Sequence, residues 1–367
     1  MPLSVEFEEK YYAAGKIKGS KWLKREGRPT DDAILTGRVI DRSIRPRFNH
    51  RMRNEVQVVA TVLSFDRIND ADMPALFGAS LALMISDIPY RGPVSSVRVG
   101  RVDGQFVINP TYAERITSDI DIIVAGTSEK INMLEAGANI VPEKDITDAI
   151  AFGFTELKKL NTLQEKIAKE IAPVKHDIVV SDRDEALATM VNDFVAPKLE
   201  QGLYTLSKQE FYKNIHEAHD SVLDYVRTAL IDLPAGPLRQ GSSEASKADD
   251  PALNKKLADA EHYFEDTIDK IVHKNILESE KRPDGRKLDE LRNISAEVNV
   301  LPQTHGSGLF QRGQTQALSI LTLASPGMEQ WMESMEIDLT KKRFMHHYTF
   351  PPFSVGETGR IGNPGRR

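Results

Sequence analysis

Residues 19–48 read GSKWLKREGRPTDDAILTGRVIDRSIRPRF, and their pattern decides how the N-terminal part of the chain is interpreted. Pro29, followed by Thr30 and two aspartates, is typical of a helix start, because proline suits the first turn and acidic side chains suit the N-terminal end of the helix dipole. Pro46 should end the helix near Ile44. The apolar residues expected to face a core are Ile34, Val39, Ile40 and Ile44.

Arginines line another face of this predicted helix. Arg38, Arg42 and Arg45 are spaced at i, i+4 and i+7, which places them on one side. Each guanidinium can hold two phosphate oxygens, so the stripe suits a row of phosphates. The alternative is a solvated face whose arginines pair with neighbouring acids such as Asp41.

The loop before the helix combines an aromatic side chain with cations. It contains Trp22, Leu23, Lys24 and Arg25 between flanking glycines. Base stacking with backbone neutralisation is how proteins bind single strands with little sequence preference. Residues 16–53 hold twelve Lys or Arg against four Asp or Glu, although the whole chain has a formal net charge of -6. This local excess predicts a positive field that attracts a polyanion.

The composition favours an ordinary globular protein. The 367 residues suffice for two or three domains, and 40% apolar with 28% charged residues is normal for this class. The sequence has no run of about 18 apolar residues and no signal-peptide pattern. Cysteine is absent, which excludes disulfides and thiolate metal sites. We therefore expect a cytoplasmic protein without a membrane span.

The first 172 residues predict one α/β domain. Residues 73–86 are small and apolar on nearly all sides, which predicts a buried helix. A long amphipathic helix is expected at 143–171. The strands of this domain are expected at 3–10, 55–65 and 120–125, with a hairpin at 95–109 around Asp103-Gly104.

Residues from about 181 to 280 are helical in pattern and rich in charge, and a flexible linker is expected at Leu233–Pro251. Strand patterns return at ISAEVNVLP from Ile294, and continue through GLFQRGQTQALSILTLAS to HHYTFPPFSVGE. The segments VEFEEKYYAAGKIKGSKWLKREGR and HHYTFPPFSVGETGRIGNPGRR share one order of features, which suggests a duplicated domain.

Other polar residues give weaker signals. His346 and His347 are interpreted as structural, because no carboxylate stands at ligand spacing. Asp119 and Asp121 share one face of a strand, where basic partners, solvent or a metal would each explain them. The RPDGR segment at 282–286 is interpreted as a turn. The P-loop and HExxH motifs are absent, so nothing indicates ATP hydrolysis or a zinc hydrolase.

Several segments together resemble the bacterial polynucleotide phosphorylase family. They are YYAAGKIKGSKWLKREGRPTDDAILTGRVIDRSIRP, NEVQVVATVLS, FGASLALMISDIP, RPDGR, LPQTHGSGLFQRGQTQAL and HYTFPPFSVGETG, in this order along nearly the whole chain. The resemblance implies an α/β (α+β) fold with RNase PH-like (ribosomal protein S5 domain 2-like) cores. The expected domains are a first core without its N-terminal strands at 1–172, an all-helical RNA-binding or linker domain at 175–280, and the N-terminal part of a second core at 282–367.

The resemblance also implies an activity. Family members form ring-shaped trimers, in which single-stranded RNA enters a central pore and inorganic phosphate releases nucleoside diphosphates from its 3′ end. We therefore expect a processive phosphorolytic 3′–5′ exoribonuclease of mRNA degradation, a transferase by reaction type. The cofactor and partners implied are Mg²⁺, inorganic phosphate, RNA, a homotrimer and RNA degradosome-type proteins, with KH and OB-fold modules farther along the chain.

Site residues follow from the same resemblance. Residues matching the loop that narrows the pore, where the family has two aromatics and one residue fewer, are Trp22, Leu23, Lys24 and Arg25. Residues matching basic RNA-binding positions of the first core are Arg28, Arg38, Arg42 and Arg45. Residues matching positions near the RNA end and the phosphate are His347, Arg366 and Arg367. The family's metal-binding aspartates and phosphate-cradling serines lie beyond position 367, so we name no catalytic residue or metal ligand and expect the 367-residue chain alone to be inactive.

Two other functions stay open. One is a non-catalytic RNase PH-like ring subunit that binds RNA, and the other is a ribosome- or mRNA-associated scaffold. A second core that carries the aspartates would distinguish the enzyme from the ring subunit. Tight RNA binding without any dependence on phosphate would indicate the scaffold.

Overall fold

The computed structural model describes residues 2–17, 26–177, 183–205, 207–231 and 251–361. Contacts divide the chain into two compact units. The first unit comprises residues 1–181 and 324–367, and the second unit comprises residues 182–323. The three predicted domain ranges stay predictions.

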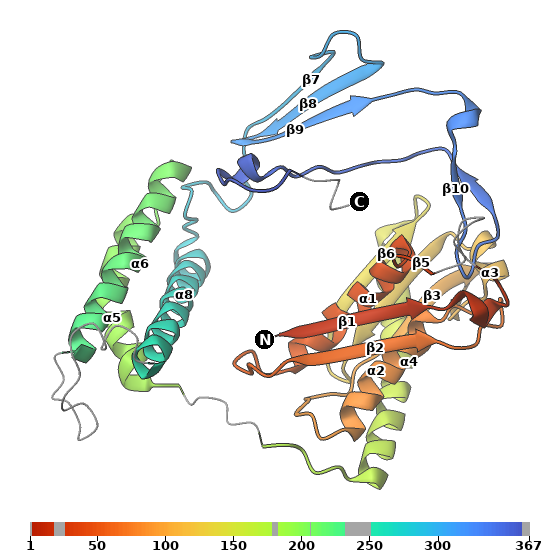
Figure 1. Ribbon diagram of the computed structural model, residues 1–367, viewed down its shortest axis with the longest axis horizontal. Coiled ribbons are helices and arrows are strands. Elements are labelled where there is room, and N and C mark those ends of the chain that lie inside the picture. The colour runs from red at the N-terminus through yellow and green to blue at the C-terminus, as the bar shows by residue number, and fades with distance from the viewer. Residues whose placement is uncertain (1, 18–25, 178–182, 206, 232–250, 362–367) are drawn as a thin grey trace. The chain divides into compact units, whose positions relative to one another are not determined.

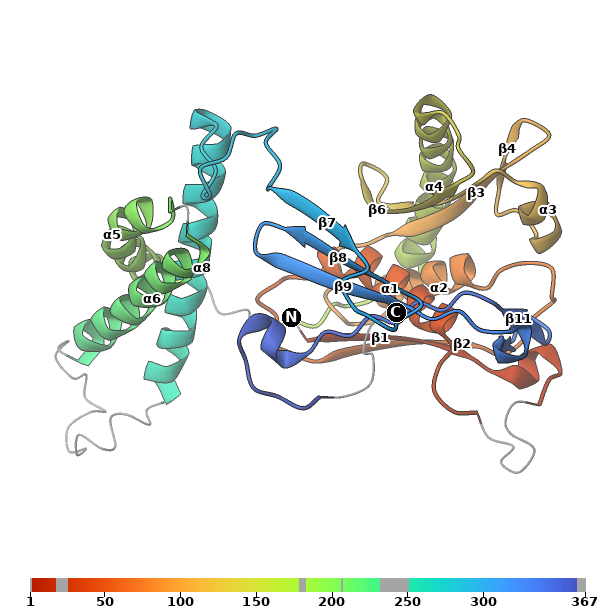
Figure 2. The same cartoon turned by 90° about the horizontal axis from the view of Figure 1, so that it is seen from above.

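The first unit is built in four layers, whose order can be followed in Figure 1 and Figure 2. A parallel strand pair, β1 (Leu3–Glu9) and β2 (Val56–Val62), forms one outer layer. Helices α1 (Asp31–Ile44) and α2 (Asp72–Ile85) form the next layer. An antiparallel sheet follows, and helix α4 (Glu143–Ile171) covers its far face.

The antiparallel sheet confirms the predicted hairpin. Val102 pairs with Gln105, and the turn residues Asp103 and Gly104 have positive φ values of 51° and 77°. The short helix α3 (Tyr112–Thr117) precedes β5 in the sequence. The strands are β3 (Ser95–Val102), β4 (Gln105–Ile108), β5 (Ile120–Gly126) and β6 (Ile131–Ala138), and their order in the sheet is β4-β3-β5-β6.

Alternation along β5 shows that both faces of this sheet are covered. Ile120, Ile122 and Val124 pack in one core with residues of α4. Ile123 and Ala125 belong to the other core, which α1, α2, β1 and β2 complete. Helix α2 therefore lies between two sheets, which explains why its sequence is apolar on nearly all sides, as predicted.

The described residues of the second unit form the helices α5 (Glu185–Gly202), α6 (Lys208–Ile231) and α8 (Pro251–Ser279) and an antiparallel meander, which are labelled in Figure 1. These helices pack around one apolar core. The predicted linker at 233–251 lies outside the described residues except for its last residue, where α8 begins. The strands of the antiparallel meander are β7 (Ile294–Val298), β8 (Gly306–Arg312) and β9 (Thr315–Leu321).

Two sequence predictions are wrong. Residues 346–357 do not form a strand, because Pro351 and Pro352 lack the N–H groups that a strand ladder needs. The short strands of this region, β10 (Gln330–Met332) and β11 (Thr340–Lys342), come before it. Ile34 is 50% exposed, since it lies about 120° around α1 from the buried Ile40.

The two copies of the predicted repeat share one backbone conformation. Each contains a four-residue 3-10 helix, η1 (Tyr11–Ala14) and η4 (Pro352–Val355), that ends at a glycine. Gly15 and Gly356 both adopt the left-handed region, with φ of 69° and 81°. In each copy the glycine N–H donates to the carbonyl three residues earlier, and the next N–H donates to the carbonyl five residues earlier. This identity of local structure supports a duplicated domain.

A turn from the C-terminal segment of the first unit packs against its N-terminal part. Residues 333–338, between β10 and β11, are called the docked turn. Met335 in this turn is fully buried among the core side chains of the first unit. The Tyr11 hydroxyl donates to the Glu333 carbonyl at 2.9 Å, and the Lys16 ammonium donates to two further carbonyls of the turn, both at 3.2 Å.

Glu336 places a carboxyl group of the docked turn near other acids. Burial, together with the negative charges of Asp70, Glu9 and Asp32, raises the pKa of Glu336 from 4.5 to about 7, partly offset by Tyr112. When folding raises the pKa of a carboxyl group, the group is protonated in both the folded and the unfolded state at pH values below its unfolded pKa. In that range it does not change the free energy of unfolding. Stability falls as the pH rises from 4.5 to about 7, and it stays lower above that range.

Glu336→Gln should therefore stabilise the protein at pH 8 relative to wild type, by about 1–2 kcal/mol, and by much less at pH 5. The full 1.36 kcal/mol per pKa unit is reduced by solvent screening of the partly exposed side chain. Urea unfolding at both pH values measures the effect. Asp338→Asn is the control, because the Lys16 ammonium at 2.8 Å lowers the pKa of Asp338 and keeps it ionised at both pH values. A gain for Glu336→Gln that is equal at pH 5 and pH 8 would contradict this account.

Candidate nucleic-acid interface

Hydrogen bonds of one side chain fix the start of α1. The Thr30 hydroxyl accepts the backbone N–H of Ala33 at 3.0 Å and donates to the carboxylate of Glu9 at 2.8 Å. The predicted helix start is thus confirmed, and it is tied to the end of β1. The predicted core residues of α1 that are buried are Val39, Ile40 and Ile44.

The arginine stripe of α1 divides into two kinds of residue. Arg38 and Arg42 are exposed, and neither side chain has a hydrogen-bond or ion-pair partner among the residues that the structure describes. Arg45 donates to the Asp41 carboxylate at 2.6 Å and to the Leu3 carbonyl at 2.9 Å. Pairing with Asp41 is therefore observed at Arg45, whereas Arg38 and Arg42 present charges to which a phosphate has access.

The other predicted site residues are less constrained. Arg28 is exposed just before α1, and His347 is exposed on the irregular segment before η4. Neither shares an element with the helix arginines. The predicted pore loop (Trp22, Leu23, Lys24 and Arg25) and the pair Arg366 and Arg367 lie outside the described residues, so their roles stay predictions.

A cluster of charges inside the first unit was not apparent from sequence patterns. Arg98 on β3 donates to the Asp72 carboxylate and to Asp121 at 2.5 Å. Asp70 joins the cluster through Arg98 at 3.4 Å and through Arg115 at 2.8 Å. These ion pairs connect α2, β3, α3 and β5. They also answer one open question, since Asp121 has basic partners.

Asp119, the other aspartate left open, likewise pairs with Arg101, whose Nε lies 2.9 Å away. No group of three or more His, Asp or Glu within the described ranges is arranged to hold a metal ion. Arginines already neutralise the clustered aspartates of the first unit. The described residues therefore do not fit a Mg²⁺ site, and we route no chemical step through that ion.

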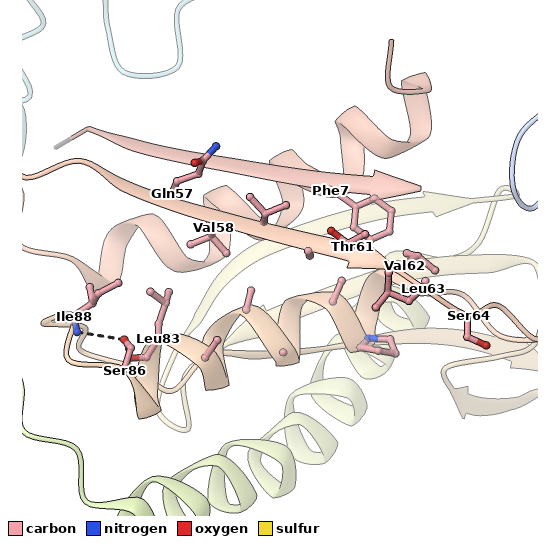
Figure 3. Close-up of a pocket in the computed structure, with 18 residues that line it drawn as sticks. Phe7, Gln57, Val58, Thr61, Val62, Leu63, Ser64, Leu83, Ser86 and Ile88 are labelled. Carbon is pink, nitrogen blue, oxygen red and sulfur yellow. Dashed lines mark hydrogen bonds between the residues drawn. The ribbon is translucent and has the colours of Figure 1, made fainter. Parts of the chain in front are cut away.

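The first unit also contains an apolar groove between β2 and α2 (Figure 3). Its volume is about 630 Å³, and small or apolar side chains such as Val58, Val62 and Leu83 form its walls. At one end the Ser86 hydroxyl accepts the backbone N–H of Ile88 at 3.2 Å. Because so few polar groups converge there, the groove is not suited to a phosphate-bearing ligand.

Comparison with known proteins identifies the family. Domain 1 of the 3′ exoribonuclease family matches residues 1–89 and 290–367, and domain 2 of that family matches residues 92–156. The chain therefore belongs to the 3′ exoribonuclease (RNase PH) family, and the predicted fold class is confirmed. Two matches to domain 1 agree with the repeat whose copies share one backbone conformation.

Several curated relatives share the name polyribonucleotide nucleotidyltransferase. The chain is 45% identical over 366 residues to that of Geobacillus kaustophilus (strain HTA426) and 46% identical over 366 residues to that of Halalkalibacterium halodurans. It is 43% identical over 381 residues to that of Bacillus subtilis (strain 168). The matches cover 100% of this chain and 47%, 48% and 49% of the respective relatives. The chain thus spans about half the length of the curated relatives it matches. Every helix in the described part of the chain is too short or too polar to cross a membrane.

Proposed function

We propose that the chain forms part of a phosphorolytic exoribonuclease, which shortens single-stranded RNA from its 3′ end and releases nucleoside diphosphates. The observation that carries this proposal is the shared name of relatives that match the whole chain at 42–46% identity. The same observation favours the enzyme over the non-catalytic ring subunit and over the scaffold.

Phosphorolysis requires mainly electrostatic stabilisation from the protein. Phosphate is itself the nucleophile, so the protein has to hold two polyanions together and stabilise charge on the bond that breaks. Arg38 and Arg42 suit the RNA backbone, because both are exposed and lack protein partners among the described residues. We assign the RNA end and the phosphate to His347, Arg366 and Arg367 on the family resemblance.

Further properties belong to the same proposal and rest on the resemblance alone. They are Mg²⁺ as cofactor, a homotrimeric ring, degradosome-type partners, a role in mRNA degradation and a cytoplasmic location. The metal ligands would come from residues other than those described, and the described arginines would act on RNA whether or not the ion is bound.

The phosphate dependence of RNA degradation tests the proposal. The complete gene product should convert poly(A) to ADP when inorganic phosphate is present and should leave it intact when phosphate is removed. AMP formed in phosphate-free buffer would identify hydrolysis and overturn the proposal. RNA binding without degradation under any condition would instead favour the ring subunit.

Removing the two open arginines of α1 should weaken the binding of single-stranded RNA. We expect Arg38→Ala with Arg42→Ala to lower the slope of log affinity against log salt by roughly 1.4, since each lost phosphate contact removes about 0.7. Fluorescence anisotropy over a range of salt concentrations measures the slope. Lys159→Ala is the matched control, because Lys159 is exposed but pairs with Glu156 on α4, in a different layer. An equal change of slope in the control would refute a role of α1.

A further inference from the structure

The second unit contains a cavity of about 680 Å³ that the proposed function does not use. Phe211 and Tyr212, near the start of α6, line one side. The RPDGR turn at 282–286, the residues before β7 and the turn between β8 and β9 line the other. The Gly285 N–H donates to the Arg282 carbonyl at 3.0 Å, so the segment forms the predicted turn.

The charges that line this cavity are strongly unbalanced. Arg286 and Arg292 donate to the same carboxylate oxygen of Asp284, at 2.7 and 3.2 Å, and Arg282 lies 3.7 Å from that carboxylate. Three guanidinium groups therefore share one negative charge, and a fourth arginine adds to the excess. The charged residues that line the cavity are Arg282, Arg286, Arg292, Arg312 and Asp284, and we call it the arginine cavity.

The carboxylate in the arginine cavity is ionised at neutral pH. Burial alone would raise the pKa of Asp284, but hydrogen bonds from Arg286 and the charges of Arg286 and Arg282 hold it below its ordinary value. The positive excess is therefore what remains after Asp284 has contributed its full charge. Glu290, which lines an adjoining cavity of about 390 Å³, has its carboxylate engaged by the Lys287 N–H at 3.1 Å.

Two of the arginines hold the loop in place. Arg282 donates to the Lys287 carbonyl at 3.1 Å, and Arg286 donates to the Glu290 carbonyl at 2.7 Å. These bonds satisfy the turn's own backbone, and a structural role explains both residues. They also fix one wall of the cavity before any ligand arrives, which lowers the entropic cost of binding.

The other two arginines are not explained in this way. Arg312, at the end of β8, is exposed, and its side chain has no hydrogen-bond or ion-pair partner within the described part of the chain. Arg292 has a side chain that is 51% exposed, and its only partner there is the shared Asp284. The aliphatic part of the Arg292 side chain lies on Gly313, where an added Cβ would come within 3.1 Å of the Arg292 Cδ. The glycine thus leaves room for Arg292 along the wall of the cavity.

The aromatic wall adds a second kind of contact. Phe211 and Tyr212 meet edge to face, with ring centroids 5.5 Å apart and planes at 79°. Tyr212 is 52% exposed and lines the cavity. An exposed aromatic ring beside guanidinium groups is suited to a planar base that is joined to phosphate.

We propose that the arginine cavity is a nucleotide-binding site, in which Arg292 and Arg312 contact the phosphate groups and Tyr212 contacts the base. Inorganic phosphate supplies only the first contact and a nucleoside only the second, so a nucleoside diphosphate should bind better than either. The site lies in the second unit, and its occupation does not require RNA cleavage by the protein.

Isothermal titration calorimetry of the 367-residue chain with ADP tests this proposal. Wild type should bind ADP, and Arg292→Ala and Arg312→Ala should each weaken binding roughly tenfold, since hydrogen bonds to charged groups are among the strongest that proteins make. Tyr212→Ala should weaken binding of ADP but not of inorganic phosphate. Arg227→Ala is the matched control, because Arg227 is exposed on α6, pairs with Asp224 and does not line the cavity. Far-UV circular dichroism checks that each variant is folded.

Specific outcomes would overturn the proposal. They are the absence of ADP binding by wild type, an equal loss in Arg227→Ala, and a Kd that Arg292→Ala and Arg312→Ala leave unchanged. Loss of ADP binding in Arg38→Ala with Arg42→Ala, and not in Arg312→Ala, would place the nucleotide on α1 instead. Binding of an oligonucleotide but not of ADP, with dependence on Arg312, would identify an RNA groove and refute the nucleotide. Absence of phosphorolysis would overturn only the proposed function.

Discussion

Arg98→Ala is expected to lower the free energy of unfolding by about 3–5 kcal/mol, because removing one partner strands a buried charge. The side chains of Arg98 and Asp72 are only 10% and 7% exposed. Burial alone would lower the pKa of Arg98, but the charges of Asp72 and Asp121 outweigh it, so the guanidinium stays charged. Alanine would leave the Asp72 carboxylate inside the first unit without its main partner.

Urea unfolding followed by far-UV circular dichroism measures this loss. Arg101→Ala is the control, since the partners of Arg101, Asp119 and Asp145, are 41% and 36% exposed, and such pairs contribute about 1 kcal/mol or less. The double variant Arg98→Met with Asp72→Leu should recover part of the stability, because it removes both charges together. Equal losses in Arg98→Ala and Arg101→Ala would show that burial of the cluster does not matter.

Met335→Ala is expected to cost about 2–5 kcal/mol, the range for removing a large buried side chain. Met335 is fully buried in the core of the first unit, although it comes from the C-terminal segment, residues 324–367. The loss should therefore reduce the stability of the whole first unit and should not be confined to the segment around β10 and β11.

The control for this prediction is Met328→Ala, because Met328 is 69% exposed and surface substitutions change stability by about 0.5 kcal/mol or less. Chemical denaturation of the two variants gives the comparison. An unchanged midpoint for Met335→Ala would mean that only polar contacts, such as those of Tyr11 and Lys16, hold the docked turn.

Elements with a strong local pattern could be predicted from the sequence. The helix at 143–171 and the strands at 3–9 and 120–126 have the periodicity that their burial requires. β6 (Ile131–Ala138) has no such pattern, because Glu135 and Gly137 interrupt it, and its strand form follows from pairing with β5. Such pairing depends on tertiary structure, which local propensity does not contain.

The candidate interface was predictable only in part. The sequence spacing predicted that Arg38, Arg42 and Arg45 share one helix face. Only the structure shows that Arg45 already forms an ion pair with Asp41. The buried charge cluster could not be predicted from the sequence, for a similar reason. Arg98 stands between Val97 and Val99 in a strand whose two faces are both covered, and its partners come from α2, from the loop before α2 and from β5. The sequence shows the alternation but not the layer that covers the second face.

The docked turn also sets the order in which the first unit can be completed on the ribosome. Tyr11 and Glu333, which one hydrogen bond joins, are 322 positions apart. At about 5–20 residues per second, roughly 16–64 s separate their synthesis. During this interval the place of Met335 is an apolar hollow on a nascent chain. The first unit can therefore complete its core only after residue 335 has been synthesised.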